Sequence, residues 1–334
     1  MIAAKRVGVV GVGAISDWHV RALKVAGLQV SAVGTRPGSQ RLGEFAARHA
    51  IPAAFEDWRD MLAHPEWDGL VIAVPPEGTV DVLSGAIPIG VPILVEKPTA
   101  WASSALQPLI EHASQRLMVG YNRRFYRPAQ EARAEAQRGS PLLAQLILPE
   151  SIKPQGGADP ERRYLLPFLE DSCHGLDLAR FVLGTLRTER VDRIVDSDGR
   201  LVCLGAVLSS DRGDLLQLVA NWGTPANFGL SLNSAGRRFD LCPFELATIY
   251  EGMDVLDPTD EFPIRRYVPR VVDRIPVAEI DRREKPGFVG QAEALKDMID
   301  GKEPPAFAAS LQDAVSVLRL CEELLGPYVP IHPR

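Results

Sequence analysis

The sequence has few cysteines, and they lie far apart. Its 334 residues contain four of them, with no C-x-x-C pair: Cys173, Cys203, Cys242 and Cys321. Scattered thiols favour neither a disulfide framework nor a zinc site, and they are typical of a chain that stays reduced. We therefore expect a cytoplasmic protein without a structural metal ion.

Long apolar runs and long basic runs are also missing. No apolar stretch approaches the length of a membrane span. Lys5 and Arg6 precede an apolar run, but glycines interrupt that run and no small-residue cleavage site follows, so a secretory signal is not expected. A net charge of −6 without a basic cluster argues against nucleic-acid binding. The expected partner is a small molecule, not a nucleic acid or a membrane.

The overall composition is that of a globular protein with more than one domain. Hydrophobic residues make up 46% of the chain and charged residues 24%, which are ordinary values. A chain of 334 residues is long enough for two domains, each with its own core.

Strand and helix patterns alternate in the first part of the chain. Short apolar runs, which predict buried strands, recur between helical patterns at residues 7–10, 28–34, 69–74, 93–95 and 117–120. Such a series predicts an α/β fold with a Rossmann domain, that is, a doubly wound parallel sheet. We place this domain at residues 1–122.

The pattern changes near residue 140. Strand patterns then follow one another at residues 143–148, 190–195, 201–208, 215–222, 228–233, 238–241 and 246–251. One helix, at 167–184, interrupts them, and two more close the chain. Residues 254–277 are predicted to be a loop or an irregular edge strand. Residues 123–334 should thus form an α+β domain with an open, mainly antiparallel sheet.

A glycine turn follows the first predicted strand. Gly11 and Gly13 come directly after residues 7–10, and apolar residues then recur at helical spacing. Strand, glycine turn and helix are the context of a dinucleotide fingerprint, in which Gly11 permits the turn and Gly13 leaves room for a pyrophosphate. Ser16 takes the third small-residue position. The alternative is a structural turn without a ligand.

Two charged residues end a later predicted strand. Glu96 and Lys97 follow residues 93–95, and Pro98 stops the strand. Open α/β sheets bind ligands at the carboxyl ends of their strands. The alternative is a solvated pair on a loop.

The helix at 167–184 carries three polar residues at helical spacing. Glu170 lies four residues before His174, and Asp177 lies three after it, so an α-helix places them on one face. A carboxylate beside a histidine can orient the ring for general acid–base work. Alternatives are a solvated helix face, a helix cap or, against the usual spacings, a metal site.

A third polar stretch follows residues 117–120. Tyr121, Asn122 and Arg123 stand directly after this predicted strand, where their polar groups could line a pocket. The alternative is a solvated stretch of the domain linker.

Together these motifs resemble the Gfo/Idh/MocA family (glucose–fructose oxidoreductase, inositol dehydrogenase and rhizopine catabolism proteins). The matching pieces occur in the family's order and at its spacing: Gly11-x-Gly13, Val74-Pro75-Pro76, Glu96-Lys97-Pro98, Gly120-Tyr121-Asn122-Arg123-Arg124-Phe125 and His174-x-x-Asp177. The resemblance implies an enzyme that transfers a hydride reversibly between NAD(P) and a hydroxyl carbon of a sugar, sugar acid or cyclitol. It also implies a homodimer or homotetramer formed through the C-terminal sheet.

The resemblance also implies roles for single residues. Lys97 would bind the nicotinamide ribose and the reacting hydroxyl, and His174 would be its acid/base, with Glu170 (or its rival Asp171) and Asp177 as carboxylates beside it. Tyr121, Asn122 and Arg123 would bind substrate. Cofactor contacts would come from Gly11, Gly13, Ala14, Ile15, Thr35, Arg36, Val74, Pro75, Glu96 and Lys97.

The second predicted strand indicates which cofactor is preferred. An NAD-binding fingerprint places a carboxylate near its end, but this chain has Thr35 and Arg36 there and no carboxylate before Glu44. A guanidinium binds a 2′-phosphate through charge-assisted hydrogen bonds. We therefore expect NADP to be preferred, with NAD possible; the alternative is a solvated arginine on a turn.

Two other functions are alternative interpretations of this sequence, and the first of them would use the same residues. A redox-neutral glycosidase of the same family would oxidise one carbon, eliminate the glycosidic bond and regain its cofactor. A non-catalytic NADP-sensing protein would need the Rossmann domain alone.

Overall fold

The chain forms two compact units in this computed structural model. The structure describes residues 5–64, 67–113, 116–139, 141–150, 166–197, 199 and 201–328. The first unit comprises Met1–Phe125, Glu279–Glu322 and Ile331–Arg334, and the second comprises Tyr126–Ala278 and Glu323–Pro330.

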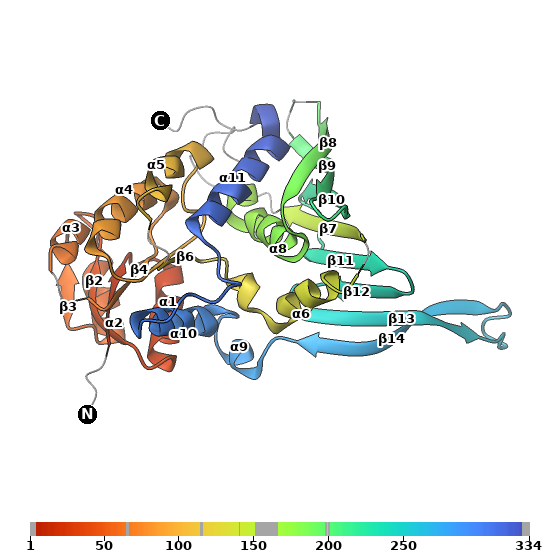
Figure 1. Ribbon diagram of the computed structural model, residues 1–334, viewed down its shortest axis with the longest axis horizontal. Coiled ribbons are helices and arrows are strands. Elements are labelled where there is room, and N and C mark those ends of the chain that lie inside the picture. Colours follow the sequence, from red (N-terminus) through yellow and green to blue (C-terminus); the bar gives the residue numbers. More distant parts are fainter. Residues whose placement is uncertain are drawn as a thin grey trace. The chain divides into compact units, whose positions relative to one another are not determined.

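The first unit is built on a six-stranded parallel sheet (Figure 1). Its strands are β1 (Arg6–Val10), β2 (Gln29–Gly34), β3 (Ala53–Phe55), β4 (Gly69–Ile72), β5 (Ile93–Val95) and β6 (Leu117–Val119). Their order is β3-β2-β1-β4-β5-β6, the doubly wound order of dinucleotide-binding folds. The predicted Rossmann architecture is thus confirmed. The sequence analysis missed β3, whose three residues are only half-buried or exposed.

Helices cover both faces of this sheet. The main ones are α1 (Ala14–Val25), α2 (Leu42–His49), α3 (Trp58–Leu62), α4 (Pro76–Ala86), α5 (Gln107–Ile110) and α10 (Phe288–Ile299). The short helical turns are η1 (Ile87–Ile89), η2 (Ser103–Leu106) and η3 (Asn122–Phe125). One apolar core joins α1, α2 and α10 to the central strands. Figure 1 shows α10, drawn in blue, beside the red α1.

The late segment 279–322 belongs to the first unit. The sequence pattern predicts that this segment, with everything after residue 122, lies in the second domain. The difference has a physical cause, because Phe288, Ala292 and Leu295 of α10 are buried in the core that contains β1 and α1. In addition, the Val119 N–H donates to the carbonyl of Ala309 at 2.8 Å. Ala309 thereby forms an antiparallel bridge with β6.

The second unit is built on an eight-stranded open sheet. Its strands are β7 (Leu143–Glu150), β8 (Leu186–Val195), β9 (Leu201–Ser210), β10 (Leu215–Trp222), β11 (Gly229–Ser234), β12 (Arg237–Leu241), β13 (Leu246–Leu256) and β14 (Arg266–Pro276). Among the strands that the structure describes in this sheet, only β7 and β10 pair in parallel. The predicted mainly antiparallel sheet is confirmed.

Part of the stretch predicted as loop or irregular edge strand is a regular strand. β14 pairs with β13 through eleven-residue strands at the sheet edge, and register shifts at Tyr250 mark bulges in the pair. Figure 1 shows the two as one long hairpin. Prolines and charges, which suggested irregularity, are tolerated because an edge strand leaves half of its backbone groups to solvent.

Helices pack on one face of the second sheet. They are α6 (Arg127–Ala136), which the sequence analysis did not expect, and α8 (Cys173–Leu183), which follows the π-helical turn η4 (Phe168–Ser172). The remaining elements are α9 (Glu279–Arg283), α11 (Leu311–Leu325) and η5 (Gly326–Tyr328).

Candidate functional site: a nucleotide cavity and its neighbours

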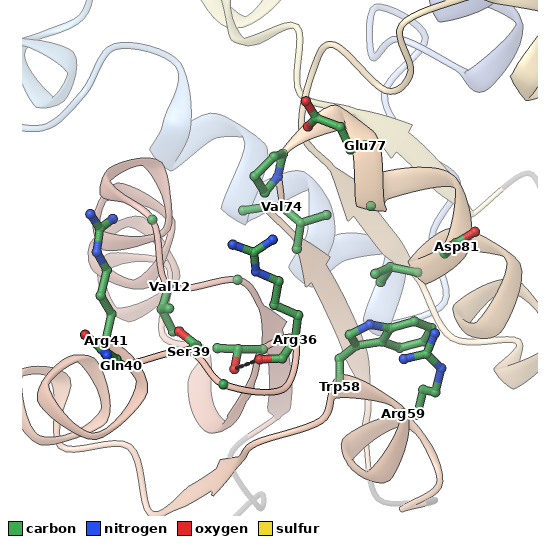
Figure 2. Close-up of a pocket in the computed structure, with 18 residues that line it drawn as sticks. Val12, Arg36, Ser39, Gln40, Arg41, Trp58, Arg59, Val74, Glu77 and Asp81 are labelled. Carbon is green, nitrogen blue, oxygen red and sulfur yellow. Dashed lines mark hydrogen bonds between the residues drawn. The ribbon is translucent and has the colours of Figure 1, made fainter. Parts of the chain in front are cut away.

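A large cavity opens where β1, β2 and β4 end. Its volume is about 1050 Å³. Backbone after β1, the loop after β2 and the start of α4 line it (Figure 2). Nucleotides usually bind at the carboxyl edge of a doubly wound sheet, in the crevice that forms where the strand order reverses. In this sheet the order reverses between β1 and β4.

Gly11 is required by the backbone. Its φ is +112°, a conformation that other residues rarely adopt. A Cβ there would lie 2.1 Å from the carbonyl oxygen of Ala73, and the Gly11 N–H donates to the Gly34 carbonyl at 2.8 Å. The residue therefore fixes the loop after β1 against the ends of both neighbouring strands.

Gly13 is not required by the backbone. Its φ of −80° and ψ of 173° suit any residue, and a Cβ there would meet nothing within 4 Å. Yet Gly13 lines the cavity and precedes α1, whose N-terminus has no side-chain cap. Uncapped N–H groups at a helix start bind anions. An open cradle that a Cβ would fill fits a dinucleotide pyrophosphate.

Three arginines line the cavity. Arg59 stacks on the Trp58 ring at 4.3 Å and lies 3.4 Å from Asp57. Arg36 and Arg41 are exposed; in the described part of the chain, neither forms an ion pair. Figure 2 shows Arg36 extended towards Val74. Positive charge that is not already neutralised favours an anionic ligand.

Thr35 is held within its own loop. Its hydroxyl donates to the Arg36 carbonyl at 3.0 Å. Its N–H donates to Phe55 at 3.2 Å, and its carbonyl accepts from Trp58 at 2.7 Å. The β3 strand and the start of α3 thereby brace the loop that presents Arg36.

The structure separates the residues expected to contact a cofactor into two groups. Those that line the cavity are Gly11, Gly13, Thr35, Arg36, Val74 and Pro75. Those outside its lining are Ala14 and Ile15, which begin α1, and Glu96 and Lys97, which follow β5. The roles of both groups stay predictions.

Glu96 is a buried carboxylate. Its Oε1 lies 2.8 Å from His19 Nε2, and its Oε2 accepts the Lys97 N–H at 3.0 Å. Burial alone would raise the pKa of Glu96, but the hydrogen bond and charge of His19, together with Lys97, bring that pKa below its usual value. Glu96 is therefore ionised at neutral pH. Lys97 itself is half-buried.

The residues expected to bind substrate after β6 lie in or near the core of the first unit. Tyr121 and Asn122 are buried, and Arg123 is half-buried. The Asn122 side chain donates to the Pro286 carbonyl at 2.8 Å, so this amide also ties η3 to the segment before α10.

In the second unit, α8 carries His174 and Asp177. Both side chains are buried, and their spacing of three residues keeps them on one face. Gly175 allows a close approach to the sheet, because a Cβ there would lie 2.5 Å from Leu148 Cδ2. Glu170 belongs to the π-helical turn that precedes α8, and its place on the same face as His174 stays a prediction.

In the described ranges, no group of three or more His, Cys, Asp and Glu side chains could hold a metal ion. Of the helices formed by these ranges, none is both long and apolar enough to cross a bilayer.

Comparison with known proteins shows a family match over the first part of the chain. Residues 5–121 match the family described as an oxidoreductase family with an NAD-binding Rossmann fold, GFO_IDH_MocA. Over these residues the chain is similar to this family. The resemblance predicted from the sequence motifs is thus confirmed.

Individual relatives are more distant. The chain is 29% identical to the rhizopine catabolism protein MocA of Rhizobium meliloti over 242 residues, 70% of this chain and 72% of that protein. It is 29% identical to inositol 2-dehydrogenase 1 of Saccharopolyspora erythraea over 195 residues, 54% of this chain and 55% of that protein. The chain spans about half the length of several of the curated relatives it matches.

Solved structures share the fold. Levoglucosan dehydrogenase, in complex with NADH and levoglucosan, matches with a TM-score of 0.74 at 14% identity, over 97% of this chain and 96% of that one. At this identity the likeness concerns the fold alone.

The sequence analysis missed several residues of the site. Arg41, Trp58 and Arg59 line the cavity, but nothing in their local pattern separates them from surface residues. His19 left one signal, because it lies on the apolar, buried face of α1. A lone histidine there does not reveal that its partner is Glu96, 77 positions away.

Gly13→Ala separates a ligand-driven glycine from a structural one. Since an added Cβ meets nothing, we expect the free energy of unfolding to change by less than about 0.5 kcal/mol. NADPH affinity, measured by fluorescence titration, should fall by at least about tenfold. Gly43→Ala, where a Cβ also meets nothing, is the matched control and should leave affinity unchanged. NADPH binding equal to wild type in the Gly13 variant would show that no pyrophosphate approaches there.

Proposed function

We propose that this chain transfers a hydride between NADP(H) and a hydroxyl carbon of a sugar, sugar acid or cyclitol. One observation carries the proposal: the cavity at the carboxyl edge of the parallel sheet combines the open Gly13 cradle with the cationic Arg36. Similarity to an NAD-binding oxidoreductase family over residues 5–121 supports it.

The nicotinamide supplies hydride acceptance and donation when it is bound. The protein must then hold and move a proton. We assign that proton to His174, which takes it from the hydroxyl during oxidation and returns it during reduction. Asp177, three residues later on the same face of α8, is assigned to the histidine motif with Glu170. Lys97 is assigned to the reacting hydroxyl, where an ammonium stabilises developing negative charge on oxygen.

Arg36 and Arg41 support the preference for NADP. Both flank the loop after β2 and line the cavity. The carboxylates of the lining, Glu77 and Asp81, lie across the cavity on α4. A 2′-phosphate at the end of β2 would thus meet guanidinium groups and no carboxylate, whereas a 2′-hydroxyl would gain less from these charges.

The names of relatives support the substrate class. One relative is named inositol 2-dehydrogenase, and another was solved with levoglucosan. Inositol is a cyclitol and levoglucosan is a carbohydrate, and both compounds carry secondary hydroxyls on a ring. A polyhydroxylated ring is therefore the substrate class proposed for this chain.

The outer face of the second sheet supports self-association. Leu143, Ile147, Leu215 and Val219 of the parallel pair β7 and β10 are 39%, 45%, 40% and 40% exposed. Gln145 and Gln217 join between them, at 3.4 Å. An exposed apolar patch of branched side chains, with no charges at its centre, is typical of a subunit interface. We propose a second copy of this chain as its partner.

Cofactor titration tests the preference for NADP. Wild type should bind NADPH more tightly than NADH. Arg36→Ala should weaken NADPH binding by about 10- to 100-fold, as loss of a charged hydrogen bond does, and leave NADH binding nearly unchanged. Arg319→Ala, an exposed arginine of α11, is the control. Tighter binding of NADH by wild type would contradict the preference.

His174→Asn tests the proton carrier. With sugars and cyclitols screened in both directions, we expect turnover to fall by about 10²- to 10⁴-fold, the usual contribution of general acid–base catalysis. NADPH affinity should be retained. His112→Asn, an exposed histidine, should behave as wild type. Full turnover by the His174 variant would remove the assignment.

A charged substitution tests the self-association. Val219→Asp places a carboxylate at the centre of the apolar patch, so the dimer or tetramer mass seen by light scattering should fall to that of the monomer. Val25→Asp, at an exposed valine of α1 that is 49% accessible, should leave the mass unchanged. A wild-type chain that is monomeric would refute the proposed interface.

A further inference from the structure

Glu96 and His19 form a buried pair in the first unit. Their side chains come from positions 77 residues apart, Glu96 after β5 and His19 in the middle of α1. Glu96 is 7% exposed and His19 1%. The distance of 2.8 Å between Oε1 and Nε2 is that of a strong hydrogen bond. With Glu96 ionised, the ring must donate from Nε2.

The carboxylate of Glu96 is fixed from several sides. Its Oε2 accepts the backbone N–H of Lys97 at 3.0 Å. The Glu96 N–H donates to the Ile72 carbonyl at 2.8 Å. Gly120 packs against the carboxyl group, since a Cβ there would lie 3.1 Å from Cδ. Two hydrogen bonds and the close approach of Gly120 therefore hold the Glu96 carboxyl group in one orientation.

His19 is fixed just as firmly. Its ring lies 4.7 Å from the Phe288 ring of α10, at an interplanar angle of 41°. α1 itself starts directly after Gly13, at the edge of the cavity. The pair therefore connects the helix of the nucleotide cavity to the backbone of Lys97.

A pair of this kind is a poor device for stability alone. Removing a carboxylate and an imidazole from water costs free energy that the hydrogen bond between them only partly offsets, and apolar residues of similar volume often stabilise as much. The pair does fix an orientation, because hydrogen bonds are directional. They hold the Glu96 carboxylate in one orientation, and through it the backbone N–H of Lys97. Such precision matters where a reacting group has to be placed.

We propose that Glu96 and His19 are positioning residues, which hold the backbone of Lys97 relative to α1 so that its ammonium reaches the bound nicotinamide ribose. This inference rests on the proposed function, since it takes Lys97 as a cofactor contact. Glu96 then acts through Lys97, without touching the cofactor itself.

Acetylation of Lys97 by acetic anhydride, followed by mass spectrometry with and without NADPH, tests the inference without a substrate. In wild type, saturating NADPH should slow acetylation of Lys97 by about tenfold or more. In Glu96→Ala and His19→Ala this protection should fall below about threefold, while the NADPH affinity stays within about threefold of wild type. His19→Gln keeps an N–H donor and should keep the protection.

Two variants separate positioning from loss of the fold. Gly120→Ala pushes on the Glu96 carboxyl group without removing a hydrogen-bonding group, and it should also lose the protection. Glu322→Ala removes a carboxylate that accepts the Ser103 N–H at 2.6 Å and its hydroxyl at 2.8 Å. It matches Glu96→Ala in chemistry and should keep the protection.

If NADPH still protects Lys97 fully in the Glu96→Ala and Gly120→Ala variants, the inference is overturned. The proposed function would then still stand. Loss of protection in Glu322→Ala as well would overturn it too, because the effect would then be general destabilisation. Absence of protection in wild type that binds NADPH overturns both the proposed contact of Lys97 and this inference.

Discussion

The contact between Gly11 and the carbonyl of Ala73 is the constraint on which the nucleotide cavity depends. It lies at the boundary between β1 and β4, where the strand order reverses. Because Gly11 has no side chain, its backbone can pass close to that of Ala73 at the end of β4. The chain then turns directly from β1 into α1. The N-terminus of α1 therefore faces the crevice, and the loops after β2 and β4 form its two walls.

Charge is used in two ways in the first unit. Arg36 and Arg41 are exposed beside the cavity, where water solvates them and where a ligand can exchange with that water at little cost. Glu96 and His19 are buried, so the hydrogen bond between them replaces one that each would otherwise make with water. Exposed charges are suited to binding a ligand reversibly. A buried hydrogen-bonded pair is suited to holding neighbouring groups in a fixed position.

The sequence predicts elements that are defined by local pattern. Residues 7–10 and 69–72 appear as strands because every side chain there is apolar, and the glycine turn follows from Gly11 and Gly13. Local pattern fails where distant residues decide. β3 is too short for a pattern, α10 joins a core formed far earlier in the chain, and His19 meets Glu96 only in the fold. The π-helical turn before α8 escaped because the spacing argument assumes 3.6 residues per turn.

The return of residues 279–322 to the first unit bears on the order in which the protein is made. The sheet of the second unit is complete at Pro276, whereas the core of the first still lacks α10 at that point. During synthesis the second unit can thus finish its sheet while the nucleotide unit waits for its last helices. A ribosome-bound chain that ends before Phe288 carries the glycine turn but leaves the apolar face of α1 uncovered. The core that supports the nucleotide cavity is therefore completed only near the end of translation.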